Sequence, residues 1–248
     1  MSLQLYSVQS SGFADLRSDP LPAMLRTWRN QTLPLPDTGT HFGFVYQGQP
    51  HLFRQAKRDS YRLQTGMYFC LPGGGSVGSE NSSGIIVTRL GYDGMFSLGG
   101  PLEPNGRFAY IDGGTNSLLI PPVMRGDACL NAMYFPAQVN QTLHTHPSYR
   151  IGLVVSGSGQ IETPATQARI SPGMIFVIPA NALHKFRTDE SGFTIVVFHP
   201  DSDTGFSHRD NPMLKRTLVE GVSAASLPHL QTKLTSGQGE SKSGDRPL

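Results

Sequence analysis

The strongest structural signal in the chain is the stretch HTHPSYRIGLVVSGSG at residues 144–159. Its apolar, β-branched centre at residues 151–155 ends at a Ser-Gly pair, and a run bounded in this way is typical of a β-strand. ISPGMIFVIP at residues 170–179 has the same character. We therefore expect neighbouring strands of a small antiparallel sandwich or barrel in this region.

This region has a copy in the N-terminal half of the chain. The matching pairs are GFVYQG (43–48) with GLVVSG (152–157), LQTGMYFCLP (63–72) with ISPGMIFVIP (170–179), and GIIV (84–87) with GFTIVV (192–197). The offset is 109 residues for the first pair, 107 for the second and 108 for the third. A near-constant offset across three strands indicates an internal duplication.

Composition supports an all-β protein without nucleic-acid partners. Only 15% of the residues are charged, and 28 Gly and 19 Pro supply turn-formers. Such a composition, without a long helical pattern, favours short strands and tight turns. The formal net charge of +2 is too small to indicate nucleic-acid binding, and no Lys/Arg cluster changes that.

Nothing in the sequence predicts export or a membrane. MSLQLYSVQSSGFADLRSDP at the N-terminus lacks the apolar core of a signal peptide. No stretch approaches the roughly 18 apolar residues that span a bilayer. Cys70 and Cys129 share no CxxC-type spacing, so we interpret them as free, buried thiols in a reducing compartment. We expect a cytoplasmic protein.

The duplication and the composition divide the chain. We expect an N-terminal barrel at 1–98, an inter-barrel connection rich in Gly and Pro at 99–127, a C-terminal barrel at 128–205, and a C-terminal region at 206–248. Residues 213–225 are expected to form a short helix, and the sequence from residue 231 has the composition of a disordered tail.

Three histidines of the C-terminal half form a candidate metal site. His144 and His146 are two residues apart, so on a strand their side chains point to the same face. His184 follows a turn at residues 179–181 and precedes the next strand. Three imidazoles can bind Zn, Cu, Ni or Fe. An HxH pair alone is a weak signal, and histidines held by hydrogen bonds in a core or on a surface are the alternative.

The sequence around these histidines resembles the cupin superfamily. The first cupin motif is HxH, three or four residues, Glu, six residues and Gly; here it corresponds to His144, His146, Arg150 and Gly157. The second motif is Gly, five residues, Pro-x-Gly-x-x-His, three residues and Asn. It corresponds here to Gly173, Pro179, Asn181, His184 and Thr188. The resemblance implies an all-β fold of two double-stranded β-helix (jelly-roll) barrels, a bicupin, with His144, His146 and His184 as metal ligands.

This sequence departs from the motifs at three positions. Asn181 replaces a turn glycine, and asparagine tolerates a left-handed backbone. Thr188 replaces the final asparagine, which need not affect ligation. Arg150 replaces the glutamate ligand, and a guanidinium has no lone pair to offer a metal. The resemblance therefore implies a three-histidine site without a carboxylate.

Arg150 suggests an anionic substrate. Its spacing from His144 and His146 predicts that it faces inward as well, beside a divalent ion without an anionic protein ligand. Two neighbouring positive centres favour an anion between them, and we expect a substrate carboxylate or enolate clamped by Arg150. The alternative is that Arg150 leans outward or pairs with an acid such as Glu162. Tyr149 is a weaker catalytic candidate, and His208 is the other possible general base.

The N-terminal barrel is expected to lack a site of this type. The duplication aligns His144 and His146 with Leu35 and Asp37, and His184 with Val77. It aligns Arg150 with His41, for which we expect a hydrogen-bonded structural role. This barrel is interpreted as a structural or dimerising partner, which makes a homodimer possible.

The resemblance allows several functions. Three-histidine cupins are similar in layout to non-haem Fe(II) dioxygenases acting on small anionic or enolisable substrates, so Fe(II) is the favoured metal, with Mn, Ni, Zn or Cu as alternatives. A redox-neutral isomerase or lyase is the second possibility. The third is a non-catalytic small-molecule-binding protein, because residues 149–159 and 172–186 also look like the ligand-binding barrel of AraC-type regulators. No helix-turn-helix pattern follows residue 201, which argues against a DNA-binding role.

Overall fold

The structure is a computed structural model that describes residues 2–10, 13–207 and 210–232 of the 248. The chain forms two compact units. The first contains the residues up to Pro121 together with Ala128–Pro200, and the second contains Pro122–Asp127 together with the residues from Asp201 onward. Nearly all regular structure is β-strand, which confirms the all-β prediction.

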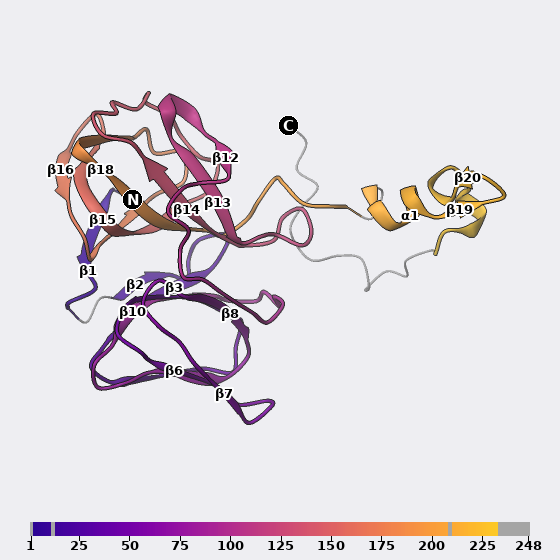
Figure 1. Cartoon of the computed structure of the whole chain (residues 1–248), viewed down its shortest axis with the longest axis horizontal. Helices are drawn as coiled ribbons and strands as arrows, with labels where there is room; N and C mark the ends of the chain where they lie inside the picture. Colours follow the sequence, from indigo (N-terminus) through magenta and orange to yellow (C-terminus); the bar gives the residue numbers. More distant parts are fainter. Residues whose placement is uncertain (1, 11–12, 208–209, 233–248) are drawn as a thin grey trace. The chain divides into compact units, whose positions relative to one another are not determined.

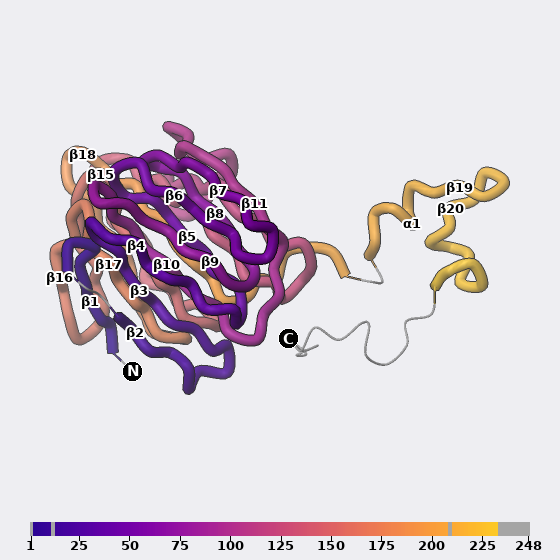
Figure 2. Tube along the Cα trace, turned by 90° about the horizontal axis from the view of Figure 1, so that it is seen from below, coloured from indigo at the N-terminus to yellow at the C-terminus, as the bar shows by residue number. Residues whose placement is uncertain are grey.

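Two facing sheets form the first barrel. One has the order β11-β8-β5-β10-β3-β2 and the other has the order β4-β9-β6-β7. Figure 2 shows β3, β10, β5 and β8 side by side. The strands are β2 (Phe13–Leu16), β3 (Ala23–Arg29), β4 (Thr32–Leu35), β5 (Thr40–Gln47), β6 (His51–Arg54), β7 (Asp59–Arg62), β8 (Tyr68–Pro72), β9 (Gly75–Gly78), β10 (Ser83–Arg89) and β11 (Ser97–Gly99). Trp28, Leu52 and Phe69 lie in the core between these sheets.

The second barrel is built from a sheet of order β1-β17-β15-β18-β14-β13-β12, with β16 paired to β15. The elements are β1 (Gln4–Ser7), β12 (Phe108–Ala109), η1 (Ile111–Gly113), β13 (Thr115–Ile120), β14 (Cys129–Phe135), β15 (Arg150–Glu162), β16 (Gln167–Ile170), β17 (Met174–Ile178) and β18 (Lys185–His199). Val154, Phe176, Phe186 and Val197 belong to its own core. Two barrels of this kind were predicted from the resemblance, and the structure confirms them.

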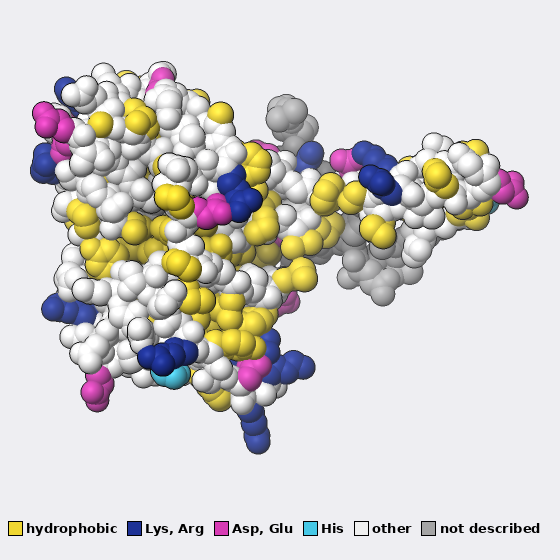
Figure 3. All heavy atoms as spheres, viewed as in Figure 1, with side chains coloured by type: hydrophobic (Ala, Val, Ile, Leu, Met, Phe, Trp, Pro, Cys, Tyr) yellow, Lys and Arg dark blue, Asp and Glu magenta, His cyan; other side chains and the backbone are white. Residues whose placement is uncertain are grey.

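A third core joins the two barrels. Leu25, Phe42 and Val87 from the first barrel pack with Ile151 and Phe198 from the second. Figure 1 shows the strands of the two barrels, and Figure 3 shows that apolar side chains also reach the surface where the barrels meet. Strands such as β15 are therefore buried on both faces, one toward their own barrel and one toward the neighbouring barrel.

Two segments extend the second sheet beyond its expected range. β1 pairs with β17, from Gln4 opposite Val177 to Ser7 opposite Met174. β13, inside the expected connection, pairs with β14. Residues 4–7 and 115–120 thus contribute strands to the C-terminal barrel, and the domain boundaries at residues 98, 127 and 205 stay a prediction.

The two copies of the duplication share a contact between a glycine and a phenylalanine ring. A Cβ atom on Gly43 would lie 2.2 Å from the Phe69 ring, and one on Gly152 would lie 2.1 Å from the Phe176 ring. In each barrel the aromatic ring thus covers a glycine of the neighbouring strand. The paired Gly and Phe of the two sequence copies therefore occupy equivalent places.

The third pair of the duplication is shifted relative to the sequence alignment. Gly43 lies opposite Ile86, and its equivalent Gly152 lies opposite Val197, which is 111 residues later than Ile86. The expected offset of 108 is therefore wrong by three residues. The second copy has additional residues between Pro179 and this strand. Comparing the sequences strand by strand does not detect such a difference in length between strands.

In the second unit, α1 (Pro212–Arg216) is followed by β19 (Leu218–Val219), β20 (Val222–Ser223), η3 (Ala224–Ser226) and η4 (Pro228–Leu230). The prediction of a helix over 213–225 is wrong beyond Arg216. Glu220 and Gly221 have φ values of 50° and 82°, which suit a two-residue hairpin turn and end any helix. The predicted tail from residue 233 onward lies outside the described residues.

Two smaller predictions can be compared with the structure. Cys70 and Cys129 are both buried and form no disulfide, as expected. None of the described helices is long and apolar enough to cross a membrane.

Candidate metal centre

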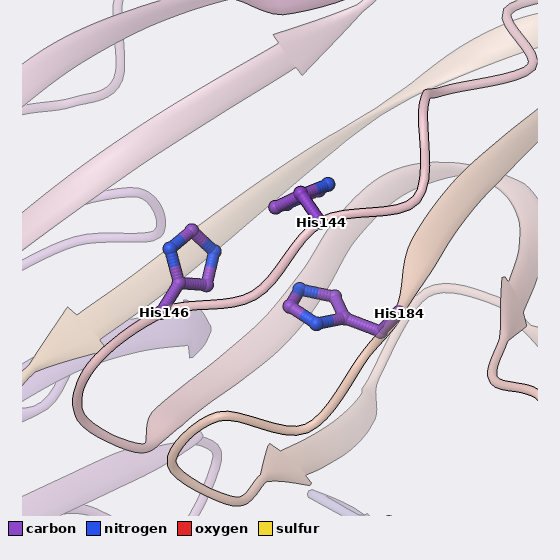
Figure 4. Close-up of side chains that lie close together, drawn as sticks. All are labelled: His144, His146 and His184. Atoms are coloured by element: carbon purple, nitrogen blue, oxygen red, sulfur yellow. The ribbon is translucent and has the colours of Figure 1, made fainter.

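The three histidines predicted as ligands converge inside the second barrel. Their nitrogen ligand atoms all lie within 4.8 Å of one another. The ring centroids are 5.0 Å apart for His144 and His146, 4.6 Å for His144 and His184, and 5.2 Å for His146 and His184. Figure 4 shows the three side chains around a common space. Among the described residues, no other three His, Cys, Asp or Glu side chains gather in this way.

Hydrogen bonds between two chain segments bring the rings together. His144 and His184 exchange two backbone N–H···O bonds of 3.0 Å, and the Asn181 N–H donates to the carbonyl of His146 at 2.7 Å. Asn181 has a φ of 58°, the left-handed conformation expected at the turn. His144 and His146 were expected on a regular strand, but their segment has only isolated bridges at Asn140 and His144. Pro147, which follows His146, has no N–H to continue a ladder.

The tautomers suit metal binding. Nδ1 of His144 donates to the carbonyl of Thr142 at 2.8 Å, and Nδ1 of His184 donates to the carbonyl of Ala182 at 2.8 Å. A carbonyl only accepts, so Nδ1 carries the hydrogen and Nε2 of each neutral ring keeps its lone pair. Backbone carbonyls commonly orient metal-binding histidines in this way.

The electrostatics of the site keep two of the rings neutral. Burial, followed by the nearby charge of Arg150, lowers the pKa of His146 to about 3. Burial also lowers the pKa of His184 to about 4, and the charges of His144 and Arg150 act in the same direction. Both rings are therefore neutral at pH 7 and bind a cation without first losing a proton. The donor set fits a divalent transition metal.

Arg150 lies inside the barrel, as its motif position predicted. It begins β15 opposite Ile178, on the face that carries Val154 in the barrel core, and is 8% exposed. Its Nη1 donates to the carbonyl and hydroxyl of Ser148 at 3.0 and 2.7 Å, and to the carbonyl of Tyr149 at 3.0 Å. Its charge lowers the pKa of His146 and His184, so it lies near the site.

Glu162, the acid named above as a partner for Arg150, pairs with another side chain. Glu162 lies 3.2 Å from the ammonium of Lys185 and forms an ion pair with it. An outward orientation is also inconsistent with the burial of the Arg150 side chain.

Tyr149 does not belong to the barrel interior. It lies in the core between the barrels, and its hydroxyl donates to the carbonyl of Leu21 at 2.8 Å. Adjacent residues of an extended chain face opposite sides, so Tyr149 and Arg150 point in opposite directions. This position argues against the catalytic role predicted for Tyr149. His208 lies outside the described residues.

Two further polar residues face the same interior and were not predicted for the site. His199 ends β18, and its Nε2 accepts from Nδ2 of Asn131 at 3.2 Å. Burial, then the charges of Arg150 and His146, hold the pKa of His199 well below its usual value. Oδ1 of Asn131 is buried without a hydrogen-bond partner among the described residues. Val197 faces the barrel core and Phe198 faces the core between the barrels, so the sequence has no apolar alternation that could have placed His199 inward.

The first barrel has apolar or hydrogen-bonded groups at the positions that the sequence alignment matched to the histidines and Arg150. Leu35 and Val77 belong to its core, and Asp37 accepts from the N–H of Gly74 at 2.9 Å. Both ring nitrogens of His41 are satisfied, Nδ1 by the hydroxyl of Thr88 at 2.8 Å and Nε2 by the carbonyl of Pro36 at 2.9 Å. The structural role expected for His41 is confirmed.

Comparisons with known proteins agree with this architecture. The sequence model of the AraC-like ligand binding domain matches residues 129–222, which cover the second barrel and part of the second unit. No curated protein matches the sequence.

Three solved structures illustrate the similarity. Protein Ylba from E. coli has a TM-score of 0.61 at 15% identity, over 83% of this chain and 93% of that one. A cupin 2 conserved barrel domain protein from Leptotrichia buccalis has a TM-score of 0.55 at 12% identity, over 79% and 88%. Salicylate 1,2-dioxygenase from Pseudoaminobacter salicylatoxidans, in adducts with gentisate, has a TM-score of 0.58 at 11% identity, over 79% and 80%. At these identities the likeness shows the fold alone.

Proposed function

We propose that this chain, which has the cupin fold in two barrels, is a metal-dependent enzyme, and specifically a non-haem Fe(II) dioxygenase. The observation that carries the proposal is the group of three imidazoles whose ligand atoms lie within 4.8 Å of one another. A bound Fe(II) would supply coordination positions at which a substrate and O₂ can meet. His144, His146 and His184 would hold the ion.

The substrate proposed for this site is a small anion or an enolisable molecule that becomes one. Three imidazoles leave the full charge of a divalent ion uncompensated, and the buried Arg150 adds a further positive charge nearby. Opposite charges attract strongly in such a poorly solvated interior. A carboxylate or enolate would therefore be held between the metal and Arg150, with the guanidinium as an anion clamp.

Structural neighbours give this proposal its first test compounds. The salicylate 1,2-dioxygenase similar to this chain was solved with gentisate, an anionic aromatic acid. Gentisate and salicylate are therefore reasonable first compounds, followed by a β-diketone and a thiol. Asn131 and His199 would line the same interior and contact parts of the substrate away from the metal.

A non-catalytic ligand-binding role is the second candidate. The match of residues 129–222 to the AraC-like ligand binding domain favours it. Such a protein would use the interior of the second barrel to hold a small molecule without turnover. The two candidates differ in metal content and in oxygen consumption.

Elemental analysis of protein purified without added metal is the first experiment, with the double variant His144→Ala/His146→Ala as control. About one equivalent of iron, lost in the control, together with oxygen uptake on one of the test compounds, is the expected result. Zinc or nickel bound at the same site would favour a redox-neutral isomerase or lyase over a dioxygenase. Metal-free protein that binds gentisate without consuming oxygen would overturn the enzyme proposal in favour of ligand binding.

A further inference from the structure

The segment that carries His144 and His146 depends on individual hydrogen bonds for its position. It runs from Pro136 to Tyr149, between β14 and β15, without a continuous strand ladder. The hydroxyl of Thr188 holds its start, donating to the carbonyl of Pro136 at 2.7 Å and accepting from the N–H of Val139 at 2.8 Å. The partner groups in these bonds, and in the backbone hydrogen bonds of His144 and His146 described above, belong to residues 181–188 of the same barrel.

One tether comes from elsewhere in the chain. Oδ2 of Asp112 accepts from the N–H of Thr142 at 2.7 Å, and Oδ1 accepts from its hydroxyl at 3.2 Å. The carbonyl of this same Thr142 accepts the Nδ1 hydrogen of His144 at 2.8 Å. A continuous path of hydrogen bonds thus runs from the carboxylate of Asp112 through one residue to the imidazole of His144.

The backbone of Asp112 is held in an uncommon conformation. Its φ and ψ are 53° and 37°, within the short helix η1 (Ile111–Gly113) of the inter-barrel segment. A left-handed conformation costs a residue with a side chain on the order of 1 kcal/mol relative to glycine. The N–H of Gly114 closes the turn by donating to the carbonyl of Ile111 at 3.0 Å. This turn directs the Asp112 carboxylate at Thr142.

We propose that Asp112 is a positioning residue for the metal centre, holding the Thr142 carbonyl that orients the His144 ring. The proposal rests on the proposed metal-binding function of the three histidines. The two hydrogen bonds accepted by the Asp112 carboxylate fix the Thr142 backbone, and with it the direction in which the Thr142 carbonyl points at Nδ1 of His144. The Nδ1 hydrogen of His144 is then held more firmly, which fixes the ring and increases the donor strength of Nε2.

The test is a titration of the metal-free full-length protein with Co²⁺, followed by its visible absorption spectrum. Asp112→Gly removes the carboxylate and accepts the left-handed backbone without strain, so the loss of the tether is isolated. We expect Co²⁺ to bind about 10-fold more weakly, the lower end of what outer-shell partners contribute. The spectrum at saturation should also change, because the His144 ring is free to turn.

Two further variants make the result specific. Asp112→Asn keeps one carbonyl oxygen for the Thr142 N–H, and it should restore most of the affinity. Asp127→Ala is the matched control, because the Asp127 carboxylate accepts from backbone N–H groups of Val123 and Met124 at 3.2 and 2.8 Å, within the same inter-barrel sequence. Its Co²⁺ affinity should equal that of the wild type.

The outcomes separate this inference from the proposed function. Wild-type affinity and an unchanged Co²⁺ spectrum in Asp112→Gly would overturn the positioning role while leaving the metal site intact. Failure of the wild-type protein itself to bind Co²⁺, Zn²⁺ or Fe²⁺ would overturn both.

Discussion

Arg150 occupies the position at which the cupin motif has a glutamate ligand, and its side chain lies within the second barrel near His146 and His184. The exchange replaces a group that would donate a lone pair and a negative charge by one that can do neither. The three imidazoles contribute no negative charge to a bound divalent ion, which favours an anionic ligand there. This single position therefore sets the sign of the substrate proposed for the protein.

Arg150→Met is expected to leave metal content unchanged and to weaken binding of gentisate to the metal-loaded protein. The lost charged hydrogen bond corresponds to about 1.5–3 kcal/mol, or roughly 10-fold to 100-fold in affinity. Arg150→Lys keeps the charge and should lose less. Calorimetric titration with gentisate, with uncharged hydroquinone as the comparison ligand, measures the effect. Equal gentisate affinity in wild type and Arg150→Met would exclude the clamp.

We expect His41 to make the stability of the first barrel depend on pH. Burial lowers its pKa, and the Nε2–H tautomer satisfies both the carbonyl of Pro36 and the hydroxyl of Thr88. The folded protein thus resists protonation, whereas the unfolded chain takes up a proton below about pH 6.5. The contribution of His41 to stability is present above that pH and is lost as the pH falls toward the lowered pKa.

His41→Gln should therefore destabilise the protein more at pH 7.5 than at pH 5.5. Disrupting two buried hydrogen bonds should cost about 1–3 kcal/mol at the higher pH. Urea unfolding of both proteins at the two pH values gives the four free energies required, and the other histidines cancel in the difference. The same destabilisation at both values would show that His41 titrates normally in the folded state.

At the level of elements, a glycine on one strand and a phenylalanine on the next recur in both barrels. Gly43 and Gly152 leave room for the rings of Phe69 and Phe176, which lie where a Cβ atom would be. Their offsets between the two sequence copies are nearly equal, 109 residues for Gly43 and Gly152 and 107 for Phe69 and Phe176, which helped to make the duplication detectable. The match between the two copies could be recognised in the sequence because the phenylalanine ring requires a glycine on the neighbouring strand.

Gly152→Ala should destabilise the second barrel by about 1–3 kcal/mol, because its methyl group would meet the Phe176 ring at 2.1 Å. Phe176→Leu offers a smaller side chain, and combining it with Gly152→Ala should recover part of the loss. A double-mutant cycle by thermal or urea unfolding measures this coupling. Strict additivity of the two substitutions would mean that the ring moves aside freely.

The conformation of residues 136–149 could not be predicted from a strand pattern. His144 and His146 were expected on a strand, yet both are held by separate hydrogen bonds, including those to His184 and Asn181. The HxH spacing still predicted the convergence correctly. The tether to Asp112 could not be predicted, because it joins two loops through a backbone conformation that leaves no periodic signal.

In the whole molecule, the core between the barrels decides which way β15 faces. The hydroxyl of Tyr149 reaches the carbonyl of Leu21 in the first barrel, whereas Arg150 faces the interior of the second. β1 adds a second connection, because the N-terminal residues of the chain extend the C-terminal sheet. The barrel that carries the three histidines is thus completed by parts of the chain that lie far away in sequence.

Tyr149→Phe tests this assignment. Removal of the hydroxyl should lower the free energy of unfolding by about 1 kcal/mol, because the Leu21 carbonyl loses a hydrogen bond in a buried position. Metal content and gentisate affinity of the folded protein should not change. A loss of ligand binding without a loss of stability would return Tyr149 to the site.

The sequence by itself determined the all-β class, the duplication, the three histidines and the absence of a carboxylate at position 150. These follow from spacing along the chain and from side-chain chemistry, both of which are local. Only the tertiary structure decided that Tyr149 faces the other barrel, that His199 lies near Arg150, and that Asp112 supports His144. The physical reason is that β15 is buried on both faces, so its apolar residues do not alternate with polar ones. Without that alternation, orientation is set by packing against the partner barrel.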